Sequence, residues 1–258
     1  MDFLLISTAV LAVVIAGLSK GGFGASAAFA ATPVLAIAVG PVASAAILLP
    51  ILIVMDWFGV RSYWRQWHWP VVWPMMLACV PGVAIGWLLF SRLSIAWLSI
   101  LLGGLTLVLF GYRLLDALRH RQMRATQPNA LGATWWGSLA GFTSFLIHAG
   151  GPPVAVYLLP LQLSKRVYQA TTVLFFAFVN AIKLVPYFAL GLFDTSNLAI
   201  SLWLLPLAPL AMLLGIWAHD KINEKLFYRV VYTLAVLASL KLLWDGVVAM
   251  NSCGARVC

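Results

Sequence analysis

The chain has 258 residues, of which 63% are hydrophobic and only 9% are charged. Soluble globular domains carry about 25% charged residues, so this composition excludes a soluble protein and indicates a polytopic helical membrane protein. The net charge of +9 does not indicate a nucleic-acid-binding protein, because the positive residues are scattered over short loops, where membrane orientation requires them.

Apolar segments long enough to cross a hydrocarbon core of about 30 Å recur along the chain. Six long spans are expected at Val42–Val60, Val71–Phe90, Ser94–Leu115, Val167–Phe188, Asn197–Trp217 and Phe227–Val248. Four shorter apolar pieces are expected at Phe3–Gly17, Ala25–Val39, Leu131–Ile147 and Val154–Leu163. The short pieces form two pairs, which are separated by GLSKGGFG (Gly17–Gly24) and SFLIHAGGPP (Ser144–Pro153). These two sequences are predicted to interrupt membrane helices.

The two interruptions occupy matching places in two halves of a weak repeat. Displacing the sequence by 127 residues places Gly24 on Gly151 and Asp56 on Lys183, and a displacement of 129 residues then places Gly86 on Gly215. Gly- or Pro-interrupted segments at corresponding positions of two halves are the best sequence indication of a transporter binding site. The predicted division is 1–115 for the first repeat, 116–130 for a basic cytoplasmic linker, 131–250 for the second repeat and 251–258 for a tail.

Loop charges predict how the halves are oriented. The basic stretch Asp116–Ala130 is expected in the cytoplasm by the positive-inside rule. If Leu131–Leu163 enters the membrane, breaks and returns, the later basic residues also face the cytoplasm, whereas a single crossing would place them outside. Those residues are Lys165, Arg166, Lys221, Lys225 and Arg229. The hairpin predicts an all-α fold of two inverted repeats, each a helix-break-helix segment plus three transmembrane helices, with Met1 outside. A kinked single crossing is the alternative.

Both interruptions carry groups that bind anions. The first offers a cation and a hydroxyl among glycines, and the second offers a histidine and glycines ahead of Pro152–Pro153. Helix N-termini and lysine side chains attract anions, so we expect both breaks to form one anion site near the membrane midplane. The predicted binding residues are Lys20, Gly21, Gly22, Gly24, Ser26, His148, Gly150, Gly151, Asn180 and Lys183. The alternative is that the glycines allow close helix packing and that Lys20 extends to a membrane surface.

Other ionisable residues near these breaks have two interpretations each. Lys183 shares a helix face with Asn180, and it either lines the anion path or extends to the membrane surface. Asp56 either accepts a coupling proton or pairs with Arg61, and pairing is favoured. His148 has a suitable ordinary pKa for proton transfer, but a lone histidine is more often a hydrogen-bonded spacer.

The remaining sequence features are structural or lie at the surface. Cys79 is predicted to be a packing residue, whereas Cys253 and Cys258 are able to pair in an oxidising compartment. Lys241 and Asp245 are expected to form a surface ion pair. No cofactor and no metal site are predicted. The expected partners are a small anionic substrate and the lipid bilayer, not nucleic acid, and a homodimer is left open.

Three segments resemble the sulfite exporter TauE/SafE family, which belongs with the 4-toluene sulfonate uptake permease type of transporter. They are GFTSFLIHAGGPPVAVYLLP (Gly141–Pro160), TTVLFFAFVNAIKLVPYFALG (Thr171–Gly191) and GLSKGGFGASAAFAATPVLA (Gly17–Ala36). Lys20 departs from the pattern, because other members often have glycine there. The resemblance implies a transporter of small sulfur-containing anions in the bacterial inner membrane, often an exporter.

The resemblance leads to a prediction of a secondary transporter that exports sulfite, sulfoacetate or a related organosulfonate by alternating access. An uptake carrier for a sulfur oxyanion such as thiosulfate is the alternative. An intramembrane enzyme using His148 or Cys79 is a remote third interpretation, because the sequence contains no H-E-x-x-H motif and no paired aspartates.

Overall fold

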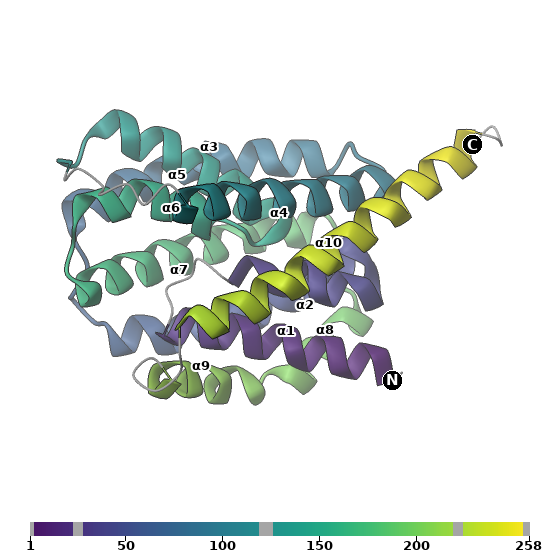
Figure 1. Cartoon of the computed structure of the whole chain (residues 1–258), viewed down its shortest axis with the longest axis horizontal. Coiled ribbons are helices and arrows are strands. Elements are labelled where there is room, and N and C mark those ends of the chain that lie inside the picture. The colour runs from purple at the N-terminus through teal and green to yellow at the C-terminus, as the bar shows by residue number, and fades with distance from the viewer. Residues whose placement is uncertain (1–2, 23–27, 119–125, 219–223, 255–258) are drawn as a thin grey trace.

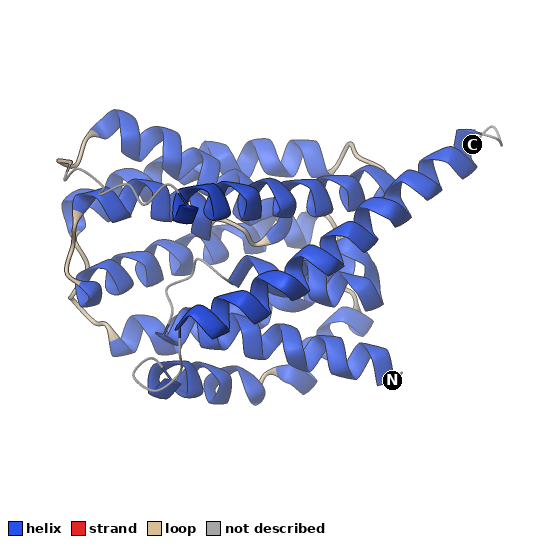
Figure 2. Cartoon of the chain, viewed as in Figure 1, coloured by secondary structure: helices blue, strands red, loops and turns tan. Residues whose placement is uncertain are grey.

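The protein is described here by a computed structural model that covers residues 3–22, 28–118, 126–218 and 224–254. Within these ranges almost every residue is helical and none lies in a strand, which confirms the predicted all-α fold (Figure 2). Five helices of the described ranges are long and apolar enough to cross a membrane, or six if one bent pair counts as a single span.

The helices follow the same order in both halves of the chain. The first half contains α1 (Phe3–Gly22), η1 (Ala28–Ala30), α2 (Ala31–Ser62), α3 (Trp69–Phe90) and α4 (Ile95–Leu118). The second half contains α5 (Ala130–Ile147), α6 (Gly151–Leu158), η2 (Leu159–Leu161), α7 (Lys165–Ala189), α8 (Thr195–Leu204), α9 (Leu207–Ala218) and α10 (Glu224–Gly254).

A short helix follows the break in each half. In the first half, Gly40 has φ 78° and ψ 170°, so the backbone leaves the helix within α2. Glycine adopts this left-handed φ without a steric penalty, and Pro41 cannot donate a backbone hydrogen bond. Residues 28–39 therefore form the first short helix, ahead of a long helix from Pro41 to Ser62. The second short helix, residues 151–161, precedes α7 in the same way.

The predicted interruption at Gly17–Gly24 begins later than expected, because α1 continues to Gly22. The reason is tertiary packing against α9. A Cβ atom on Gly17 would lie 2.4 Å from Ala211 Cβ, and one on Gly21 would lie 2.3 Å from the Met212 carbonyl oxygen. Close helix packing thus outweighs the weak helix propensity of glycine. Likewise α5 continues to Ile147, so that only residues 148–150 separate it from α6.

The expected span Asn197–Trp217 is present as a bent pair of helices rather than as one straight helix. The structure divides it into α8 and α9, whose axes are bent by 43°. Pro206 lies between them and has no backbone N–H for a helical hydrogen bond, which explains the break.

The two halves interlock. α1 packs against α9, α3 against α5, and α4 against α10. A Cβ atom on Gly215 would lie 2.8 Å from the Leu18 carbonyl oxygen, and one on Gly86 would lie 3.0 Å from Phe145 Cβ. These contacts correspond to each other in the repeat. Thus α1, the first helix of the first half, packs against α9 of the second half, and α5, the first helix of the second half, packs against α3 of the first half.

Two hydrophobic clusters form the interior. One is built mainly from α3, α5, α6 and α7, and the other mainly from α1, α2, α8 and α9. α4 and α10 cross on one face of the bundle, and the end of α10 projects beyond the other helices (Figure 1). Packing therefore crosses the predicted boundary between the repeats. The inverted orientation of the halves in the membrane and the external position of Met1 stay predictions.

Candidate anion-binding site

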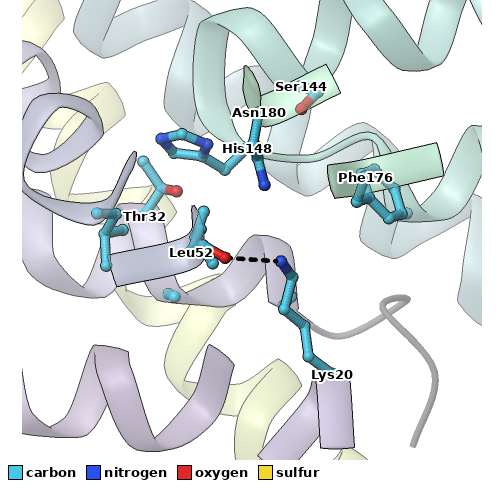
Figure 3. Close-up of a pocket in the computed structure, with 11 residues that line it drawn as sticks. Lys20, Thr32, Leu52, Ser144, His148, Phe176 and Asn180 are labelled. Carbon is cyan, nitrogen blue, oxygen red and sulfur yellow. Dashed lines mark hydrogen bonds between the residues drawn. The ribbon is translucent and has the colours of Figure 1, made fainter. Parts of the chain in front are cut away.

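A cavity lies between the end of α1, the first short helix and the second break, and residues of both hydrophobic clusters surround it. Its enclosed volume is only about 20 Å³, which is room for about one water molecule, and it opens to the surroundings. Residues from the end of α1, the first short helix, α2, α5, α6 and α7 line it (Figure 3). They are Lys20, Ala28, Ala31, Thr32, Leu48, Leu52, Ser144, His148, Gly151, Phe176 and Asn180. Segments more than 100 residues apart in sequence thus surround one space.

Lys20 enters this cavity from the last turn of α1. Its side chain is only 6% exposed and forms an ion pair with Asp56 of α2. Its Nζ atom also lies 3.5 Å from the Leu52 carbonyl oxygen, as Figure 3 shows. The Gln169 side-chain amide of α7 donates a 2.6 Å hydrogen bond to the Lys20 backbone carbonyl, which fixes the end of α1. Lys20 therefore does not extend to a membrane surface.

Asp56 is buried and accepts bonds on both carboxylate oxygens. Lys20 contacts Oδ1, and the Asn180 side-chain amide donates to Oδ2 at 2.6 Å. The predicted pair with Arg61 is wrong. Arg61 is exposed at the end of α2, and residues five apart do not share a helix face, whereas Asp56 faces α1 and α7.

Lys183 is enclosed by protein, with no exposed surface. Its Nζ atom lies 2.9 Å from the Ser144 carbonyl oxygen, 3.3 Å from Ser144 Oγ and 2.7 Å from His148 Nδ1. Three acceptors match the three donors of an ammonium group. The Tyr187 ring adds a cation–π contact, with its centroid 5.8 Å from Nζ. The lysine does not extend towards a surface, so its charge is held inside the protein.

His148 forms the left-handed cap at the end of α5, with φ 54°. Its Nε2 atom lies 3.0 Å from the Ala45 carbonyl oxygen, which only accepts hydrogen bonds, so the network assigns the ring proton to Nε2. Nδ1 then accepts the bond from Lys183. Both ring nitrogens are occupied, which favours the hydrogen-bonded interpretation of His148 over proton transfer.

The buried charges do not cancel. Within the described part of the chain, the charged residues that are buried are Lys20, Asp56 and Lys183. Lys20 and Asp56 neutralise each other, and Lys183 contacts only neutral acceptors in the described residues. A buried charge without a counter-charge is costly. The core beside the cavity thus contains two lysines and one carboxylate, and an anion bound there would balance the charge of a protonated Lys183.

The sequence model described as Sulfite exporter TauE/SafE matches residues 9–242. The chain belongs to this family. The match includes both breaks and every residue that lines the cavity. The TauE/SafE family consists of membrane transporters of sulfur anions, so this protein is a membrane transporter of that class. No curated protein and no solved structure gives a significant match.

The predicted site glycines of this TauE/SafE protein separate into different positions. Gly151 lines the cavity at the start of α6. Gly21 instead packs against α9, and a Cβ atom on Gly150 would lie 2.7 Å from Phe176 Cε1, so these two serve close packing. Gly22 is half-buried at the end of α1 and is not among the lining residues. Gly24 and Ser26 lie outside the described residues.

Sequence reasoning missed two contributors to the site. Thr32 lines the cavity from the first short helix and is fully buried. Ser144 lines the cavity and holds Lys183. Thr32 lies within the segment that resembles the family, a few residues after the first break, which is the signal that could have found it. Ser144 falls inside the predicted second interruption, but its partner is 39 residues away.

Two of three minor expectations are confirmed. Cys79 is a buried free thiol in α3 whose Sγ lies 3.1 Å from the Met76 carbonyl oxygen, so it is a packing residue as predicted. Lys241 and Asp245 form the expected exposed ion pair. The side chains of Cys253 and Cys258 lie outside the described part, so their pairing stays a prediction. In that described part, three or more His, Cys, Asp or Glu residues nowhere cluster as metal ligands.

Proposed function

We propose that this TauE/SafE protein is a secondary transporter that exports a small sulfur-containing anion across the bacterial inner membrane by alternating access. Sulfite, sulfoacetate and related organosulfonates are the proposed substrates. The observation that carries the proposal is that two lysines but only one carboxylate are buried, among the described residues, beside a cavity lined from both halves of the chain.

The cavity lining is suited to an anion with a small apolar part. Polar groups are supplied by Lys20, His148 and Asn180, together with hydroxyl-bearing side chains. Apolar lining comes from Ala28, Ala31, Leu48, Leu52 and Phe176. An oxyanion that sheds its water on entering must regain hydrogen bonds and charge from the protein. We propose that the ammonium group of Lys20 and the backbone N–H of Gly151 supply them, since Pro152 and Pro153 have no N–H to donate.

The short helices support an alternating-access mechanism. Each ends at a residue with positive φ, namely Gly40 at 78° and Gln162 at 49°, and the second also begins after the break at residues 148–150. A helix bounded at both ends is able to move relative to the long helix that follows it, and hinges are residues at such positions. Movement of the two short helices in turn would open the cavity to one side and then to the other.

Transport in liposomes tests this function. Purified protein is reconstituted, loaded separately with sulfite, sulfoacetate or thiosulfate, and assayed for efflux and for uptake under reversed gradients. We expect at least one of these anions to be carried, and efflux to be faster than uptake when protein orientation is controlled. Faster uptake would instead indicate an uptake carrier, and no flux of any of the three would contradict a sulfur-anion transporter.

A further inference from the structure

Thr32 is a fully buried threonine in the wall of the cavity, with 0% of its surface exposed. Its Oγ1 atom has no hydrogen-bond partner among the described residues. A buried hydroxyl without a partner costs about 1–3 kcal/mol in mutational studies, so such atoms are rare and call for an explanation. The two other buried side-chain atoms without partners in the described ranges belong to Trp67 and His68, which lie in the loop between α2 and α3.

Other buried threonines of this chain show what Thr32 does differently. Thr106, Thr171 and Thr172 each donate to the backbone carbonyl four residues earlier, at 2.7 to 2.8 Å. This internal bond is the ordinary solution for a helical threonine. For Thr32 the equivalent carbonyl belongs to Ala28, which lies in the 3-10 turn where the first short helix begins. The helix start therefore leaves the Thr32 hydroxyl available to the cavity.

The surroundings of Thr32 identify what the hydroxyl would bind. The cavity that it lines also contains Lys20, His148 and Asn180, and Figure 3 shows these side chains around one space. The ammonium group of Lys20 lines the cavity and Lys183 lies behind Ser144 and His148, which favours an anion there, and a hydroxyl group is a good donor to an anionic oxygen. We propose that Thr32 donates a hydrogen bond to an oxygen of the transported sulfur oxyanion and is a specificity-determining residue of this carrier.

This inference rests on the proposed function and adds the oxygen-binding position within the site. In this arrangement the –SO₃ group of the substrate binds at the end of the cavity near Thr32. Any carbon chain of the substrate then contacts the apolar lining. The competing explanation is that the Thr32 hydroxyl forms a hydrogen bond with an ordered water molecule and has no role in transport. The two explanations differ in what happens to anion affinity when the hydroxyl is removed.

The test compares three variants of the purified protein, with sulfite as the probe and sulfoacetate and thiosulfate in parallel. Thr32→Val keeps the shape and removes the hydroxyl, whereas Thr32→Ser keeps the hydroxyl. Thr106→Val is the matched control, because Thr106 is equally buried but donates to the Leu102 carbonyl. Dissociation constants are measured by calorimetry, and thermal unfolding is measured without added anion. Thr32→Ala replaces Thr32→Val if the latter does not elute as a folded protein.

We expect Thr32→Val to weaken sulfite binding about tenfold or more, as loss of a hydrogen bond to a charged group does. Thr32→Ser is expected to stay within about threefold of wild type, and Thr106→Val is expected to bind as wild type does. In the absence of anion, Thr32→Val is expected to unfold at or above the wild-type temperature, because no protein hydrogen bond is lost.

Equal sulfite affinity of the wild type and Thr32→Val would overturn the assignment of Thr32 and leave the transport function intact. A lower unfolding temperature of Thr32→Val without anion would also overturn it, because the hydroxyl would then have a structural partner. If the wild-type protein binds none of the three anions, the proposed function fails, and the role of Thr32 fails with it.

Discussion

Asp56 and Lys183 occupy corresponding positions on α2 and α7, yet the two halves use them in opposite ways. Each side chain reaches the end of the first helix of its own half: Asp56 contacts Lys20 of α1, and Lys183 contacts Ser144 of α5 and the adjoining His148. In the first half the contact joins opposite charges. In the second half a cation meets neutral acceptors only. Side chains at equivalent positions of the two halves therefore carry different charges. The lysine without a counter-charge lies in the second half.

The two clusters are not independent. Asn180 lies one helical turn before Lys183 on α7 and donates to Asp56, so the α7 face connects the ion pair of the first half to the cation of the second. Both clusters border the same cavity, through Lys20 and Asn180 on one side and Ser144 and His148 on the other. An anion in the cavity would thus contact Lys20 directly, whereas Lys183 lies behind Ser144 and His148 of the lining. This arrangement explains how a fold with similar halves provides a site for negative charge.

The largest effect is expected from breaking the ion pair of the first half. Asp56→Asn leaves Lys20 as a second uncompensated buried cation, and removing one partner of a buried pair costs about 3–5 kcal/mol. For a chain of this length, that cost lowers the midpoint of thermal unfolding by roughly 10 °C. Asp245→Asn, in an exposed pair, is the control and is expected to change the midpoint by at most about 2 °C.

The double variant Lys20→Met/Asp56→Asn sharpens this prediction. It removes both charges, so most of the lost stability is expected to return while transport stays low. A single Asp56→Asn variant as stable as wild type would show that the two charges are not paired in the protein.

The next largest effect is expected at the start of the second short helix. Gly151→Leu places a side chain in the cavity and is expected to reduce transport at least tenfold while the protein still inserts, because the space for the anion is filled. Gly111→Leu is the control, since a Cβ atom there has open space around it. Flux is measured in liposomes with matched protein content. Normal transport by Gly151→Leu would place the anion elsewhere.

The smallest effect is expected from trimming the neutral acceptors of Lys183. Ser144→Ala removes the 3.3 Å contact with Oγ but leaves the Ser144 carbonyl and His148 Nδ1 in place. The charge stays where it is, so sulfite affinity is expected to change by no more than about threefold. A tenfold loss would show that the serine hydroxyl itself binds the anion, in addition to positioning Lys183.

Much of this fold could be predicted from local sequence. The lengths of the apolar segments predicted most of the long helices. The glycines and prolines near Gly151 predicted that a break separates α5 from α6. The shared face of Asn180 and Lys183 follows from their spacing of three. The division of α8 from α9 was missed although Pro206 signals it, because the apolar run around it is continuous.

The charge pairing could not be predicted in the same way. Lys20 and Asp56 are 36 residues apart and meet only because α1 and α2 pack together, whereas Arg61 is nearer in sequence but points elsewhere. The helical state of Gly21 depends on its contact with α9, far along the chain. The unpaired hydroxyl of Thr32 depends on the geometry of a 3-10 turn. These features are set by tertiary packing, which local patterns do not encode.

The central claim is that the uncompensated charge of Lys183 creates the affinity for the anion, and sulfite binding to Lys183→Met tests it most directly. Calorimetry on purified protein is expected to show affinity reduced about tenfold or more, because a buried unit charge near the site is lost. Lys183→Arg is expected to recover only part of it, since a planar guanidinium does not fit the three acceptors of an ammonium group. Lys241→Met, which removes an exposed lysine, serves as the control and is expected to bind as wild type does. Wild-type affinity in a folded Lys183→Met protein would contradict the account.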